Sequence, residues 1–125
     1  MVQPRAVLRP LLAVGFGGMG VAHFVPGLAR GMAAIIPPSI ARRSPVDSRT
    51  LVRFTGVCEL AGATGLLIPR TRPAAAAALV VFLAAVFPAN AYAAWDPERF
   101  GAVAVPLVPR AAAQVLLAAL VVAAV

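Results

Sequence analysis

The sequence is poor in the residues that metal sites and thiol chemistry need. Cys58 is its single cysteine and His23 its single histidine. One cysteine excludes a disulfide framework, a Cys-x-x-Cys redox pair and a zinc cluster, because each needs further cysteines. One histidine and one carboxylate inside an apolar run, Glu59, do not complete the first shell of a metal site, so no metal is expected. Cys58 is interpreted as a small apolar residue within a helix.

Charge is also scarce, and one sign dominates it. Only 12% of residues are charged, all 11 basic residues are arginines, and the formal net charge is +7. A basic protein can bind nucleic acid, but here the arginines lie at the ends of apolar runs or between them. That placement is typical of contacts with lipid headgroups, so membrane lipids are expected partners and nucleic acid is not. The glycine-rich stretch at residues 15–20 lacks a preceding strand and is not a phosphate-binding loop.

Apolar residues make up 62% of the chain, and its mean hydropathy is +0.93, far above that of a soluble domain. Four apolar runs occupy about residues 10–28, 52–68, 74–95 and 103–125. Each is long enough to cross about 30 Å of hydrocarbon as a helix, which satisfies its own backbone hydrogen bonds. The sequence therefore predicts one all-α domain over residues 1–125: an integral membrane four-helix bundle whose first helix is retained, not cleaved as a signal peptide.

The longest connection, residues 29–51, contains Pro37 and Pro38, which prevent a continuous helix there. It either covers the end of the bundle or is a plain solvated connector. More arginines flank this side than the side of Arg5, Arg9, Arg70 and Arg72, and the positive-inside rule would then place the long connection in the cytoplasm. Orientation stays open, because Arg53 and Arg110 can lie inside the bundle.

Most polar residues within the four runs are predicted to fall in one layer of the bundle. His23 and Asn90 lie about 8 Å from the end of their runs, and Glu59 and Arg110 lie about 10 Å from the start of theirs. In an antiparallel bundle these four positions share one leaflet, and Gln114 follows Arg110 by one turn. A mid-membrane carboxylate is costly, which makes Glu59 the strongest functional candidate.

Two interpretations of this polar layer are open. The side chains can hold the helices together, with Glu59 paired to Arg110 and His23 bonded to Asn90. Alternatively, they line a site in which Glu59 and His23 are catalytic. The ligand-binding residues would then be Asn90, Arg110, Gln114 and Thr55.

Five segments carry a resemblance to a known family: GVAHFVP, IIPPSI, VCELAGATGLLIPRTRPAAA, VFPANAYAA and PRAAAQVLLAA. In this order they resemble the DoxX family over nearly the whole chain. The resemblance implies a four-helix membrane bundle, and some members of that family are named as subunits of quinol oxidase or thiosulfate:quinone oxidoreductase systems. The family pattern carries over onto eight positions: His23, Pro37, Glu59, Pro69, Arg70, Asn90, Arg110 and Gln114. The chain departs from it at Ala112, where a proline is expected.

These observations give three hypotheses for function. The first is a membrane protein that binds a lipophilic, quinone-like molecule in the polar layer and acts with a redox partner, because no residue here carries electrons. The second is an intramembrane acid–base enzyme, of isomerase, cyclase or epoxide-opening type, that uses Glu59 and His23 on an apolar substrate. The third is an assembly or chaperone subunit. A homo-oligomer is also possible, and the composition indicates a bacterial protein of the cytoplasmic (inner) membrane.

Overall fold

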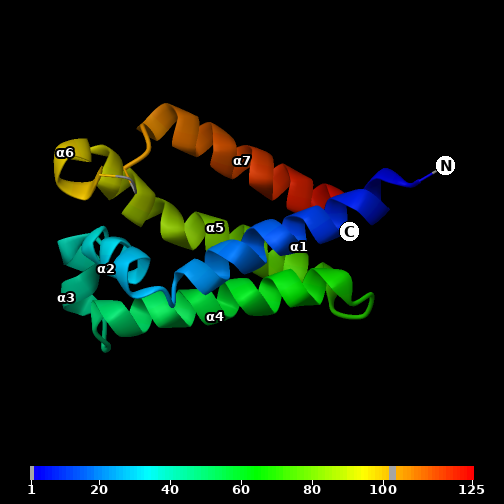
Figure 1. Ribbon diagram of the computed structural model, residues 1–125, viewed down its shortest axis with the longest axis horizontal. Helices are drawn as coiled ribbons and strands as arrows, with labels where there is room; N and C mark the ends of the chain where they lie inside the picture. The colour runs from blue at the N-terminus through cyan, green and yellow to red at the C-terminus, as the bar shows by residue number, and fades with distance from the viewer. Residues whose placement is uncertain (1, 102–103) are drawn as a thin grey trace.

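The computed structural model describes residues 2–101 and 104–125, and within these ranges the chain is entirely helical (Figure 1). The helices are α1 (Pro4–Ala22), α2 (Pro26–Ala34), α3 (Pro38–Arg43), α4 (Ser48–Leu67), α5 (Arg72–Ala94), α6 (Pro97–Phe100) and α7 (Leu107–Ala123). The predicted all-α class is confirmed. Two of these helices, α1 and α5, are long and apolar enough to cross a membrane, and α7 is apolar but shorter.

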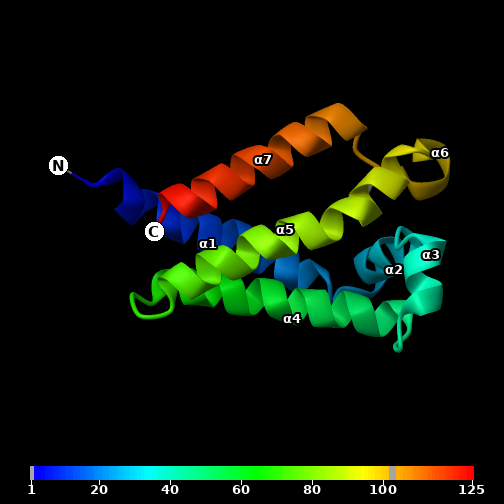
Figure 2. The same cartoon turned by 180° about the vertical axis from the view of Figure 1, so that it is seen from behind.

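The four long helices pack in chain order (Figures 1 and 2). The most extensive interface joins α1 to α4, followed by those of α4 with α5 and of α5 with α7, while the α1–α7 contact is much smaller. Arg9 contributes to it, with its Nε donating to the Ala124 carbonyl at 2.6 Å. The apolar core fills the half of the bundle near the two chain ends, with Leu66, Leu79 and Val121 among its most buried members. The opposite half carries α2, α3 and α6.

Prolines set where the helices begin and end. The first apolar run was predicted to stay helical to Leu28, but α1 ends at Ala22. Pro26 has no backbone N–H and disfavours helical geometry in the residue before it, so Val25 is extended and a new helix, α2, starts at Pro26. Pro106 similarly precedes the first residue of α7. The predicted start of the fourth run, residue 103, lies outside the described residues.

The long connection is not a plain solvated connector. It contains most of α2 and all of α3, Ile35 between them is 5% exposed, and α2 packs on α4. Pro37 and Pro38 separate the two short helices, which confirms the predicted break. The connection therefore covers one end of the bundle, beside the first turns of α4.

Thr71 and Arg72, in the turn between α4 and α5, have a structural role at the end of α4. The last carbonyls of a helix have no partner within that helix. The Thr71 hydroxyl donates to the Gly65 carbonyl at 2.9 Å, and Arg72 Nε donates to the Leu66 carbonyl at 2.8 Å. The first residue of α5 and the residue before it thus add side-chain hydrogen bonds to the last carbonyls of α4, of which that of Gly65 also accepts from the Ile68 amide at 3.3 Å.

At its other end, α4 is capped by Asp47, whose Oδ1 accepts from the Thr50 amide at 2.8 Å. Hydrogen bonding to Thr50, through its side chain and its backbone N–H, lowers the pKa of Asp47 below its usual value of 3.8. A lowered folded-state pKa means that the stabilisation is present above about pH 4 and is lost as the pH falls through the lowered value.

We therefore expect Asp47→Ala to lower the Tm by a few degrees at pH 7, because the Thr50 amide loses its acceptor. Asp47→Asn should keep most of the stability, since asparagine caps helices about as well as aspartate. Thermal unfolding in mild detergent checks this, and the gap between wild type and Asp47→Ala should shrink at pH 3. Identical Tm values for the three proteins at pH 7 would contradict the capping role.

Candidate functional site

His23 is the residue directly after the last residue of α1, and not part of a longer helix as the sequence predicted. The residue is 9% exposed, and its Nδ1 lies 2.7 Å from the Met19 carbonyl oxygen. Because a carbonyl oxygen only accepts, Nδ1 carries the proton of this hydrogen bond. In the neutral ring, Nε2 is then the nitrogen with a free lone pair, available as an acceptor or base.

Glu59 faces His23 from α4. It is 4% exposed, and its Oε2 lies 3.5 Å from His23 Nδ1. This distance suits an ion pair when the ring is protonated, yet Oε2 accepts no hydrogen bond from the described residues. The geometry accounts for both facts, since the Nδ1 proton is directed at the Met19 carbonyl. One buried oxygen of Glu59 is thus left as an open acceptor.

Two more buried polar atoms lack partners among the described residues: Asn90 Nδ2 on α5 and Arg110 Nε on α7. Both are donors. The charge of Arg110 acts on Glu59. Within the described part of the chain, however, the ion pair at 4 Å or less joins Glu59 to His23 and not to Arg110. Pro88 precedes Asn90 by two residues inside α5 and has no N–H to offer the carbonyl one turn earlier. Near Asn90, α5 therefore has a side-chain donor without a partner among the described residues and a backbone carbonyl that Pro88 cannot pair.

The other predicted ligand-binding residues already have protein partners. Gln114 Nε2 donates to the Leu83 carbonyl and joins α7 to α5. The Thr55 hydroxyl donates to the Val52 carbonyl at 2.9 Å, within its own helix. Gln114 thus helps to hold helices together, as one interpretation of the layer predicted.

The specific pairings of that interpretation are wrong. Glu59 was expected to pair with Arg110, and His23 with Asn90. The structure instead places Glu59 beside His23, whose Nδ1 bonds the Met19 carbonyl. The reason is the early end of α1, which turns the ring back onto its own last turn.

A close approach of α1 and α4 creates the His23–Glu59 contact. A Cβ atom at Gly56 would stand 2.6 Å from His23 Cβ and 3.2 Å from the Gly20 carbonyl oxygen. A Cβ at Gly20 would stand 2.8 Å from Leu60 Cγ. Only glycine lets the two backbones come this near. Small residues at these positions were visible in the sequence, but the sequence did not show that they seat the histidine.

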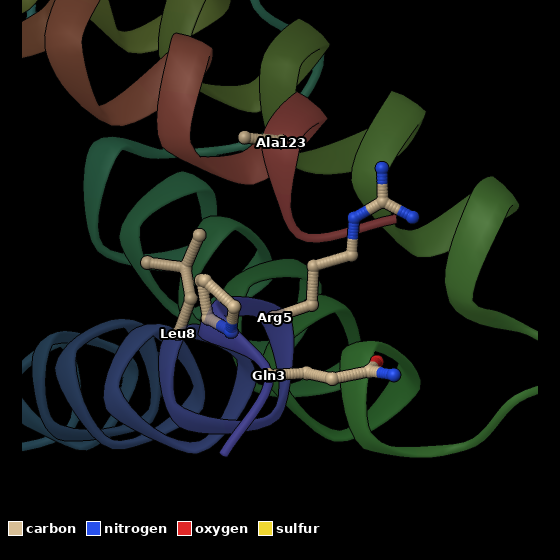
Figure 3. Close-up of a pocket in the computed structure, with 5 residues that line it drawn as sticks. Gln3, Arg5, Leu8 and Ala123 are labelled. Carbon is tan, nitrogen blue, oxygen red and sulfur yellow. The ribbon is translucent and has the colours of Figure 1, made fainter. Parts of the chain in front are cut away.

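Two hollows in the surface lie away from these polar atoms, near the chain ends. One, of about 360 Å³, is lined by residues of α1 and α7 and by the segment before α1 (Figure 3). The other, of about 610 Å³, lies between α5 and the end of α7. Their linings include none of the six predicted site residues. The case for a site in the polar layer therefore rests on its unpartnered buried atoms.

We expect Gly56→Ala to lower the free energy of unfolding by about 1–3 kcal/mol, because the added methyl group collides with His23 and with the α1 backbone. Gly18→Ala is the matched control: its Cβ would meet no atom within 4 Å, so it should be neutral or stabilise by up to about 1 kcal/mol. Denaturant unfolding in detergent measures both. Equal stability of the two variants would argue against the close packing.

Comparison with known proteins gives a family without an assigned activity. Residues 12–125 match the family described as "Domain of unknown function (DUF8561)", a description that does not mention DoxX. Comparisons with curated proteins and with solved structures gave no match. Since the match covers most of the chain, including all six residues predicted for the polar layer, the chain belongs to the DUF8561 family.

Proposed function

We propose that the protein is a multi-pass membrane protein of the bacterial inner membrane, with a four-helix bundle that binds a lipophilic, quinone-like molecule in its polar layer. One observation carries the ligand proposal. Glu59 Oε2, Asn90 Nδ2 and Arg110 Nε are buried without hydrogen-bond partners among the residues that the structure describes, and they come from three different helices. Each unsatisfied buried group costs about 1–3 kcal/mol, so an occupant that pairs with them is favoured.

The outer surface of the bundle supports the membrane location. All four long helices expose large apolar side chains, including Val14 (75%), Val57 (56%), Val81 (66%) and Val115 (70%). The apolar windows of α1 and α5 are only 17% and 22% buried, which favours membrane spans over the core helices of a soluble protein. An apolar surface of this extent is stable in lipid and costly in water. The packing of α1 on α4 also favours a retained helix over a cleaved signal sequence.

Cys58 offers a direct test of this location. It is exposed on α4, midway along the helix. In water such a thiol reacts readily, but inside hydrocarbon the reactive thiolate does not form. We expect a membrane-impermeant maleimide to leave Cys58 unlabelled in vesicles and to label it after unfolding in detergent. Arg49→Cys in a Cys58→Ala background, at the exposed start of α4, is the control that should react whenever its side of the membrane faces the reagent. Fast labelling of Cys58 in intact vesicles would refute the four-helix arrangement.

The open hydrogen-bonding groups fit a quinone and its reduced form. The N–H groups of Asn90 and Arg110 can donate to a quinone carbonyl oxygen. The Glu59 carboxylate can accept from a quinol hydroxyl and take its proton. His23 lies beside Glu59 and can stabilise its charge when protonated. The electrons must go to a redox partner, since none of these side chains carries them.

The resemblance to DoxX proteins also supports the proposal. The three side chains with open polar atoms, Glu59, Asn90 and Arg110, occupy positions of the resemblance, and so does His23. Some proteins of that family are named for quinol or quinone chemistry. The proposal thus draws on two separate lines, the open hydrogen bonds and the sequence segments.

Glu59→Gln is the sharpest test of the ligand site, because it keeps the shape of the side chain and removes its charge. We expect wild-type protein purified in mild detergent to retain a lipophilic molecule, detected by mass spectrometry and ultraviolet absorbance. The variant should bind added ubiquinone or menaquinone analogue at least about tenfold more weakly. Thr64→Ala is the control: its hydroxyl is exposed on the same helix and bonds only the Leu60 carbonyl.

Equal binding by wild type, Glu59→Gln and Thr64→Ala would overturn the ligand site. If wild type and Glu59→Gln both lack a bound molecule and are equally stable, the result would instead favour an assembly or chaperone subunit that acts through its helix surfaces. Co-purification with a membrane protein would then be the next test.

A second candidate function is supported by the His23–Glu59 contact. With Nδ1–H held by the Met19 carbonyl, Nε2 is free to act as a base, on a ring whose Nδ1 lies 3.5 Å from the buried Glu59 carboxyl group. Such a pair can move a proton on an apolar substrate, as in isomerisation, cyclisation or epoxide opening. Chemical conversion of the retained molecule, abolished in both His23→Gln and Glu59→Gln, would favour this acid–base enzyme over a binding protein.

A further inference from the structure

The end of the bundle opposite the polar layer carries a second feature, a group of arginines without nearby acidic side chains. Arg5, Arg9, Arg70 and Arg72 lie where α1 and α5 begin and α4 ends. All four acidic residues of the sequence lie elsewhere: Asp47, Asp96 and Glu98 at the opposite end and Glu59 in the polar layer.

Three of these arginines lie near one another. Arg5 and Arg9 are four residues apart on the same face of α1, and the charge of Arg72 also acts on Arg9. Nε of Arg9 is held by the Ala124 carbonyl and that of Arg72 by the Leu66 carbonyl, so the backbone fixes two guanidinium groups at this end. Arg5 has no hydrogen-bond acceptor among the described residues. Like charges gathered in this way repel one another unless an anion lies between them.

A hollow opens beside Arg5, the member of this arginine group that lines it. It measures about 360 Å³ and is lined by Gln3, Pro4, Arg5, Leu8 and Ala123. Figure 3 shows the Arg5 side chain extending from α1 toward the last turn of α7, with Leu8 on another side of the hollow. The hollow thus combines a guanidinium and an amide with apolar walls.

We propose that this end of the bundle binds the phosphate of an anionic phospholipid, with the headgroup at Arg5 and Arg9 and an acyl chain against Leu8 and Ala123. Guanidinium groups bind phosphate oxygens strongly. The apolar walls would contact an acyl chain, whereas a free phosphate ion gains nothing from them. The site rests on the proposed membrane location and is independent of the ligand in the polar layer, which lies at the other end.

The test is lipid retention measured by native mass spectrometry, with phosphatidylglycerol and phosphatidylcholine titrated into detergent-purified protein. Wild type should prefer phosphatidylglycerol. Arg5→Gln should weaken that binding about fivefold and Arg5→Glu about 25-fold, since each unit of lost positive charge near an anionic lipid counts about equally. Arg42→Gln, an exposed arginine of α3 at the opposite end, should leave it unchanged. Arg5 holds no protein partner among the described residues, so Tm should stay constant throughout.

Unchanged retention in Arg5→Glu, or the same loss in Arg42→Gln, would overturn the site. Displacement of the lipid by millimolar inorganic phosphate would also overturn it, because it would identify a free anion and not a lipid as the occupant. Failure here is separable from failure of the membrane location, since the labelling of Cys58 reports on that location alone.

Discussion

The contact on which the site depends is the close approach of α1 and α4 at Gly20 and Gly56. At this crossing the two backbones are too near for any larger side chain on either glycine. Glu59 follows Gly56 by one helical turn, so the crossing also sets the distance between its carboxyl group and His23. The end of α1 at Ala22 then directs the histidine ring back to the Met19 carbonyl. The packing of α1 on α4, the end of α1 and the His23–Glu59 contact thus all occur at this one helix crossing.

The bundle divides into two halves with different physical roles. The half near the chain ends is packed with apolar side chains of α1, α4, α5 and α7, and it holds the helices together. The half covered by α2 and α3 contains the polar layer, in which three buried atoms have no partner among the described residues. Stability from one half permits hydrogen-bonding capacity to stay open in the other, as is common where a protein binds a ligand.

Much of this arrangement could be predicted from the sequence. Long apolar runs gave the all-α class. Polar residues at similar depth in each run predicted a shared layer, in which His23 and Glu59 do lie together. The end of α1 could not be placed, because the hydropathy of residues 10–28 is continuous and a proline acts on only one or two residues. The pairings could not be predicted either, since spacing along a helix gives depth but not which neighbour a side chain faces. Gln114 illustrates this, because its partner is a backbone carbonyl of α5.

The small α1–α7 contact has a consequence for how a ligand could reach the polar layer. Three neighbouring pairs of long helices are joined along extensive interfaces, while α1 and α7 meet over much less surface, in part where Arg9 bonds Ala124. In the membrane location proposed above, a molecule among the lipid tails would displace the fewest packed side chains by moving sideways between these two helices. Such entry would let a water-insoluble compound reach Arg110 without leaving the hydrocarbon.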